Sequence, residues 1–82
     1  MVKIAPTTRP RPRQTTGERI ASLRHVLGWS QQHLAELADL SVLTVSRAEQ
    51  GCDIYAHTLE RLARALGVSM DYLWCGKEEY ER

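Results

Sequence analysis

The sequence lacks the features of a membrane or secreted protein. No apolar run approaches the roughly 20 residues that cross a bilayer, and the N-terminus has no apolar segment typical of a signal peptide. The two cysteines, Cys52 and Cys75, are too few for a disulfide framework, and no second pair gives metal-ligand spacing. We therefore expect a cytoplasmic protein without a membrane partner or a metal, in which both cysteines are buried as small apolar side chains.

The motifs of enzymes are also missing. The three histidines, His25, His33 and His57, are scattered along the chain, and the sequence holds no phosphate-binding glycine loop and no nucleophile motif. With 82 residues, a single small domain has little room for an active-site cleft with walls of its own. We therefore expect no catalysis, no cofactor and no small-molecule effector, so the function must be carried by the surface.

Charge and proline are unevenly distributed along the chain. The net charge of +1 argues at first against a nucleic-acid partner. However, residues 1–13 hold four basic and no acidic side chains, whereas the rest holds seven basic and ten acidic ones, a net charge of −3. All three prolines also lie in residues 1–13, which disfavours a helix or a paired strand there. We expect residues 1–14 to form a basic arm, which is either a solvated tail or a contact to the DNA backbone or minor groove through Arg9, Arg11 and Arg13.

From Thr15 onward the apolar residues recur at helical intervals, with capping residues between them. Thr15 and Glu18 fit a capping box, and Ser30, Ser41 and Ser69 are N-cap candidates. The pattern predicts an all-α domain over residues 15–76, followed by a short charged tail at 77–82. The helices are expected at residues 17–27, 31–38, 42–50, 56–66 and 70–75.

The apolar positions of these helices predict one small core. A strand is the competing interpretation for residues 40–46, which are rich in β-branched side chains, but nothing else in the chain offers a partner strand. A helix is therefore favoured there. The residues expected to face inward are Ile20, Leu23, Leu27, Leu34, Ala35, Leu37, Ala38, Leu40, Val45, Ala48, Leu59, Leu62, Ala63 and Leu66.

Only three residues, Asp39, Leu40 and Ser41, separate the second helix from the third. This is the length of a helix-turn-helix connection, and Ala35 is small enough to let the two helices cross closely. A generic helical hairpin would also bury one face and expose the other, so this pattern alone does not decide the function. The face left open on the third helix consists of Ser41, Val42, Leu43, Ser46, Arg47 and Gln50.

Four motifs follow one another along the predicted helices. They are Arg-Ile-x-x-Leu-Arg (19–24), Gly-Trp-Ser-Gln-Gln-x-Leu-Ala (28–35), Val-Ser-Arg-x-Glu-x-Gly (45–51) and Leu-Gly-Val-Ser-Met-Asp-Tyr-Leu (66–73). In this order they resemble the helix-turn-helix domain of phage repressors and Cro, the XRE family. The resemblance covers residues 17–74 and implies a compact, lambda-repressor-like fold of five helices. It also implies a homodimer on a twofold-symmetric operator in double-stranded DNA, with the third helix in the major groove.

The resemblance also implies a set of DNA-binding residues. Gln31 begins the second helix, where free N–H groups bind phosphate and the side-chain amide can add a donor. Arg47 is the best candidate to read guanine, with a phosphate contact as the alternative. Val42 and Leu43 depart from the polar residues usual in this family, so they either pack on thymine methyl groups or face the core. The full set is Gln31, Gln32, Ser41, Val42, Leu43, Thr44, Ser46, Arg47 and Gln50.

Further roles follow from the same resemblance. Arg24 and Glu49 are expected to form an internal ion pair, and Asp39 to adopt a positive φ where glycine is common. Met70, Leu73 and Trp74 are the candidate dimer surface, with the alternative that Trp74 only caps the core. A restriction-modification controller protein and an autoregulating antitoxin are alternatives within the same fold, and a protein-interaction module that does not bind DNA is the alternative of another class.

Overall fold

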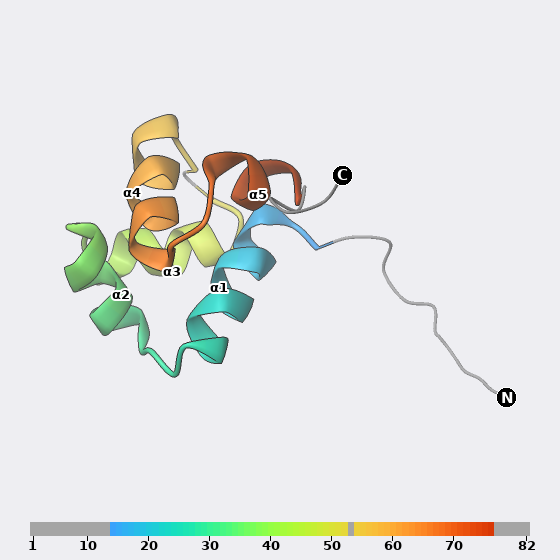
Figure 1. Cartoon of the computed structure of the whole chain (residues 1–82). Coiled ribbons are helices and arrows are strands. Elements are labelled where there is room, and N and C mark those ends of the chain that lie inside the picture. The colour runs from blue at the N-terminus through green and yellow to red at the C-terminus, as the bar shows by residue number, and fades with distance from the viewer. Residues whose placement is uncertain (1–13, 53, 77–82) are drawn as a thin grey trace, which may run out of the picture.

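The computed structural model describes residues 14–52 and 54–76, which form five α-helices (Figure 1). The described residues contain no strand, so the predicted all-α fold is confirmed and the alternative of a strand at residues 40–46 is wrong. Three predicted bounds differ by one residue: α1 begins at Thr16 instead of at 17, and Leu27 and Gln50 are the C-caps of α1 and α3. The helices are α1 (Thr16–Val26), α2 (Gln31–Ala38), α3 (Val42–Glu49), α4 (Ala56–Leu66) and α5 (Met70–Cys75).

Short polar residues begin four of the five helices. Thr15 and Glu18 form both hydrogen bonds of a capping box at the start of α1. The hydroxyls of Ser30, Ser41 and Ser69 each accept the N–H of the third helical residue, at 3.0 Å in all three helices. These hydrogen bonds satisfy N–H groups that have no partner inside the helix. The predicted N-caps are therefore confirmed.

Each helix contributes one large apolar side chain that is completely buried in the core. They are Ile20, Leu34, Val45, Leu62 and Leu73, all with no exposed surface. Small residues fill the space between them, because Ala35, Ala38, Ala48 and Ala63 are also buried. Figure 1 shows α5 lying beside the beginning of α1. The buried side chain of Leu73 joins α5 to the core.

Four side chains that were predicted to be buried are exposed instead. Leu27 is 45% exposed because it is the C-cap of α1 and lies beyond its last turn. Leu37 is 51% exposed because it lies outside the buried face of α2, which consists of Leu34, Ala35 and Ala38. Cys52 and Cys75 are both exposed, since one follows α3 in a turn and the other is the last residue of α5.

No helix in the described part of the chain has the length and apolarity needed to cross a membrane. The same residues contain no cluster of three or more His, Cys, Asp or Glu side chains placed to hold a metal ion.

Candidate nucleic-acid interface

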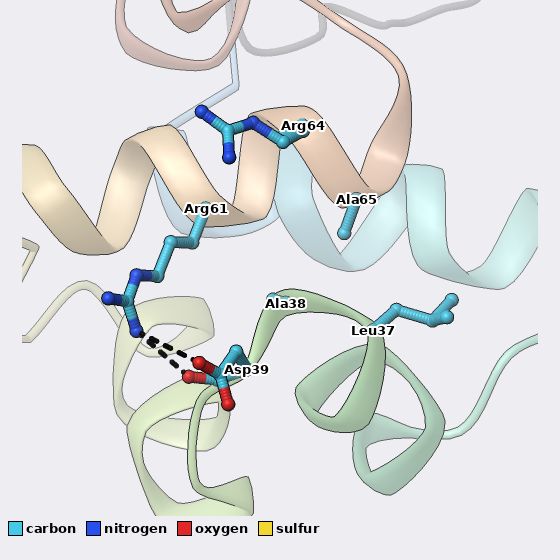
Figure 2. Close-up of a pocket in the computed structure, with 6 residues that line it drawn as sticks. All are labelled: Leu37, Ala38, Asp39, Arg61, Arg64 and Ala65. Atoms are coloured by element: carbon cyan, nitrogen blue, oxygen red, sulfur yellow. Dashed lines mark hydrogen bonds and ion pairs between the residues drawn. The ribbon is translucent and has the colours of Figure 1, made fainter.

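The turn between α2 and α3 is built around a left-handed residue. Asp39 has φ 59° and ψ 47° and ends α2, which confirms the predicted positive φ. The N–H of Leu40 donates to the carbonyl of Ala35 at 2.9 Å, which closes the turn. Ala35 itself is buried. Arg61 reaches from α4 to the Asp39 carbonyl at 3.0 Å, as Figure 2 shows, whereas Leu37 points away from this contact. The turn is therefore held both from α2 and from α4.

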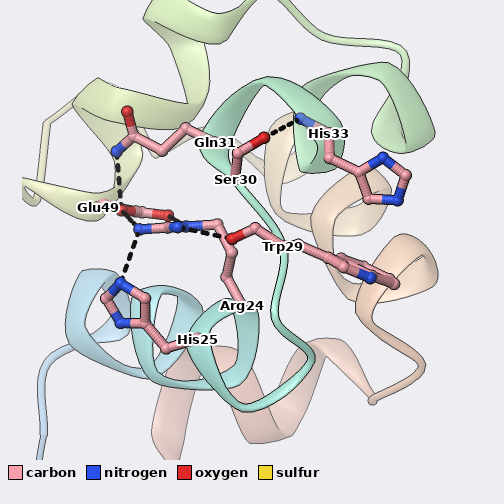
Figure 3. A network of polar contacts seen from close by, with 7 residues as sticks. All are labelled: Arg24, His25, Trp29, Ser30, Gln31, His33 and Glu49. Carbon is pink, nitrogen blue, oxygen red and sulfur yellow. Dashed lines mark hydrogen bonds and ion pairs between the residues drawn. The ribbon is translucent and has the colours of Figure 1, made fainter.

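A buried ion pair joins α1 to the end of α3. The guanidinium of Arg24 donates to both carboxylate oxygens of Glu49, from Nε to Oε2 at 2.7 Å and from Nη2 to Oε1 at 3.1 Å. Both side chains are at most 10% exposed. The third nitrogen of Arg24 donates to the carbonyl of Trp29 at 2.9 Å (Figure 3). This is the ion pair that the resemblance implies, and it neutralises the Glu49 carboxylate close to the exposed face of α3.

Gln31 takes part in the same network, which sequence reasoning did not anticipate. Its side-chain amide donates to Glu49 Oε1 at 2.9 Å, so one of its two N–H donors points inward (Figure 3). The hydroxyl of Ser30 binds the N–H of His33, and the Ser30 carbonyl binds the N–H of Leu34. Among the described residues, the backbone N–H groups of Gln31 and Gln32 have no acceptor. The beginning of α2 therefore presents two backbone donors to solvent.

The exposed face of α3 carries the side chains that were predicted for it. Val42 is 47% and Leu43 is 57% exposed, so the alternative that they face the core is wrong. Val45 and Ala48 are buried on the opposite side of the helix. The hydroxyl of Thr44 lies 2.8 Å from that of Ser41, which orients it beside the helix N-terminus. Ser41, Arg47 and Gln50 are exposed, and Ser46 is half-buried.

A hollow of about 480 Å³ separates the exposed face of α3 from the beginning of α4. The rings of Tyr55 and His57 stack beside it, with centroids 6.1 Å apart and planes inclined by 3°. Tyr55 and Thr58 were not singled out from the sequence, although their position at the N-cap and in the first turn of α4 is the signal that would have found them. The lining residues are Leu40, Leu43, Thr44, Arg47, Tyr55, His57 and Thr58.

The candidate dimer residues separate into two groups. Trp74 is 59% and Met70 is 37% exposed, whereas Leu73 has no exposed surface. The prediction that Leu73 belongs to an exposed dimer surface is wrong, because it is the residue with which α5 packs into the core. Met70 and Trp74 border a mainly apolar hollow of about 310 Å³, whose other lining residues are Ile54, Tyr55, Ala56, Leu59 and Asp71.

Arg9, Arg11 and Arg13 of the predicted arm, and the predicted tail at 77–82, lie outside the described residues. Gln14, which was assigned to the arm, contacts the body instead. Its amide donates to the hydroxyl of Ser22 at 2.9 Å, and its carbonyl accepts from Arg19.

Comparison with known proteins gives a consistent result. A family model described as a helix-turn-helix domain matches residues 16–73. The search of curated proteins gave no match. Among solved structures, the P22 c2 repressor in complex with the synthetic operator 9T is 32% identical, with a TM-score of 0.74, and the alignment covers 79% of this chain and 100% of that chain.

Two further structures are similar over most of their length. The restriction-modification controller protein C.AhdI from Aeromonas hydrophila is 32% identical with a TM-score of 0.68, over 72% of this chain and 91% of its own. The N-terminal DNA-binding domain of SinR from Bacillus subtilis is 29% identical with a TM-score of 0.68, over 80% of this chain and 96% of its own.

Proposed function

This chain belongs to the helix-turn-helix domain family, and from that premise we propose that it is a repressor-like transcriptional regulator that binds double-stranded DNA. The observation that carries the proposal is the exposed face of α3 together with the two backbone N–H groups that α2 presents to solvent, at the end of α2 whose Gln31 side chain reaches Glu49 in the last turn of α3. The similarity to a repressor bound to its operator, over the whole length of that chain, supports it. None of the three similar structures is described as an enzyme, which supports a role without catalysis.

In the proposed complex, α3 lies in the major groove. Arg47 reads guanine through its two acceptors, and Val42 and Leu43 pack on thymine methyl groups, which favours T-rich steps. The backbone N–H groups of Gln31 and Gln32 bind a phosphate at the positive end of the α2 dipole. Because Glu49 is neutralised by Arg24, its carboxylate does not repel the phosphates next to α3.

The proposal includes a homodimer. One helix-turn-helix unit reads only a half-site, so a twofold-symmetric operator requires two copies. Met70 and Trp74 form the proposed contact, because they are exposed apolar residues that border one hollow on α5. A large, exposed aromatic side chain is typical of an interface anchor.

A restriction-modification controller protein is the second candidate. C.AhdI has the same identity to this chain as the P22 c2 repressor, 32% in both cases. Both candidates bind an operator as a regulator, and they differ in the gene that they control.

Selection from a random-sequence DNA library, followed by gel-shift titration, tests the proposed function. We expect an inverted repeat to be recovered. Arg47→Gln should weaken binding to it by roughly tenfold or more, since a good bidentate base contact contributes about 1–3 kcal/mol. The matched control is Arg64→Gln, which removes the same charge from an exposed side chain paired with Glu60 on α4, and it should bind like the wild type. Recovery of no motif would contradict the proposal and favour a protein-interaction module.

A further inference from the structure

The second buried arginine of α1 contacts the end of α5 and not α3. Arg19 is only 5% exposed. Its Nε donates to the carbonyl of Leu73 at 2.9 Å, and its Nη2 donates to the carbonyl of Trp74 at 3.1 Å. Its Nη1 donates to the carbonyl of Gln14. In the described part of the chain no carboxylate pairs with Arg19, so the main-chain carbonyls there compensate for burying its charge.

These carbonyls lie where a cation is most favourable. The last carbonyls of a helix have no partner inside it, and the helix dipole places negative potential at that end. Leu73 and Trp74 are in the last turn of α5, so Arg19 acts as a C-terminal cap supplied by another helix. The Trp74 carbonyl also accepts from the hydroxyl of Thr16 at 3.3 Å.

The residue that follows α5 is a glycine next to this contact. Gly76 has φ 75°, and a Cβ atom at this position would lie 2.8 Å from Nη1 of Arg19. A six-residue helix such as α5 is too short to be stable by itself. Its orientation therefore depends on the buried side chain of Leu73 and on the hydrogen bonds from α1.

We propose that Arg19 is the positioning residue of the dimer surface. By holding the carbonyls of Leu73 and Trp74, its guanidinium fixes the last turn of α5 and hence the direction in which the Trp74 indole faces a second copy of the chain. The same guanidinium ties the beginning of the described chain, at Gln14, to that turn. The part that concerns assembly rests on the proposed homodimer, whereas the part that concerns α5 does not.

Hydrogen exchange at a dilution where the wild type is monomeric tests the α5 part. In Arg19→Met, the backbone amides of α5 should exchange roughly tenfold faster or more, because the hydrogen bonds from a charged group are removed. Arg19→Lys keeps the positive charge but loses the planar arrangement of N–H donors. It should therefore accelerate the exchange of the α5 amides less than Arg19→Met does, and it should destabilise the domain less. The amides of α2 and α3 should exchange as in the wild type. An equal acceleration in all helices, or none in α5, would overturn the proposal.

Arg24→Met is the matched control, because Arg24 is the other buried arginine of α1. It should loosen the end of α3, where its partner Glu49 lies, and lower the stability of the whole domain, so the amides of α5 should accelerate no more than those of α4. An acceleration of α5 beyond that of α4 in this control would mean that any buried arginine of α1 has the same effect, which would contradict a specific role for Arg19.

Sedimentation equilibrium tests the consequence for assembly. Arg19→Lys should raise the dimer dissociation constant by roughly tenfold, and the same substitution should have no further effect in Trp74→Ala, because both act through one contact. Additive effects would mean that Arg19 does not act through Trp74. A wild-type chain that does not dimerise would contradict the proposed function, and the exchange of the α5 amides would then decide the role of Arg19 by itself.

Discussion

At the scale of single residues, Glu49 shows how an acidic side chain can lie next to a surface that is proposed to meet phosphates. Its two oxygens accept three hydrogen bonds, two from Arg24 and one from Gln31. The carboxylate thereby joins α1, the beginning of α2 and the end of α3. The resemblance to the XRE family implied the pair with Arg24, but the spacing of the sequence could not reveal the contact from Gln31, because 18 residues separate it from Glu49.

Removal of this carboxylate should destabilise the domain. In Glu49→Ala the guanidinium of Arg24 stays buried without its partner, and breaking a buried pair in this way costs about 3–5 kcal/mol. We expect a clear fall in the free energy of unfolding measured with urea. The matched control is Glu60→Ala, which removes an exposed partner of Arg64 and should cost about 0–1 kcal/mol. Equal stabilities of the two variants would contradict a structural role for Glu49.

At the scale of the elements, helices and their caps could be predicted because their signals are local. Thr15, Ser30, Ser41 and Ser69 each lie at an N-cap, and apolar spacing gave the approximate bounds of all five helices. Which apolar residues are buried depends on the neighbouring helices, so a periodic pattern could not exclude Leu37 from the core. The burial of Leu73 has the same origin, because it follows from the packing of α5 against α1 and α4.

Two helices approach each other very closely at Gly17, which sequence reasoning did not single out. A Cβ atom there would lie 2.3 Å from the carbonyl oxygen of Glu49 and 2.7 Å from that of Ala48. These are backbone atoms, so α1 and α3 would have to move apart. The absence of a side chain at Gly17 therefore allows α1 to pack directly on the last turn of α3.

Gly17→Ala should consequently lower the stability, although alanine favours a helix by about 0.8–1 kcal/mol over glycine. Overpacking a close contact costs about 1–3 kcal/mol, and a clash with backbone at this distance belongs to the upper end of that range. We expect the midpoint of thermal unfolding to fall, as measured by circular dichroism. A midpoint equal to or above that of the wild type would mean that helix propensity outweighs the clash and that α1 and α3 can separate at little cost.

At the scale of the whole molecule, most of the positively charged side chains in the described residues are either buried or paired with an acidic side chain. Arg19 and Arg24 are buried, and Arg61 and Arg64 contact Asp39 and Glu60. The sequence shows the charge imbalance, but it could not show that these arginines are bound to neighbours. The body therefore has little positive charge left for phosphates, which increases the importance of the four basic residues at 1–13.

Deletion of residues 1–13 should weaken DNA binding in a salt-dependent way. If the basic residues bind phosphates, the slope of log affinity against log salt should become shallower by about 0.9 for each phosphate that the shortened chain no longer neutralises. The matched control keeps the length of the chain and replaces Arg9, Arg11 and Arg13 by glutamine, and it should reproduce most of this change. The selected sequence should stay the same in both variants, because α3 is proposed to read the bases. An unchanged slope would mean that these residues are a solvated tail, and the body would then have to supply the electrostatic part of the affinity from its few exposed cations and its helix N-termini.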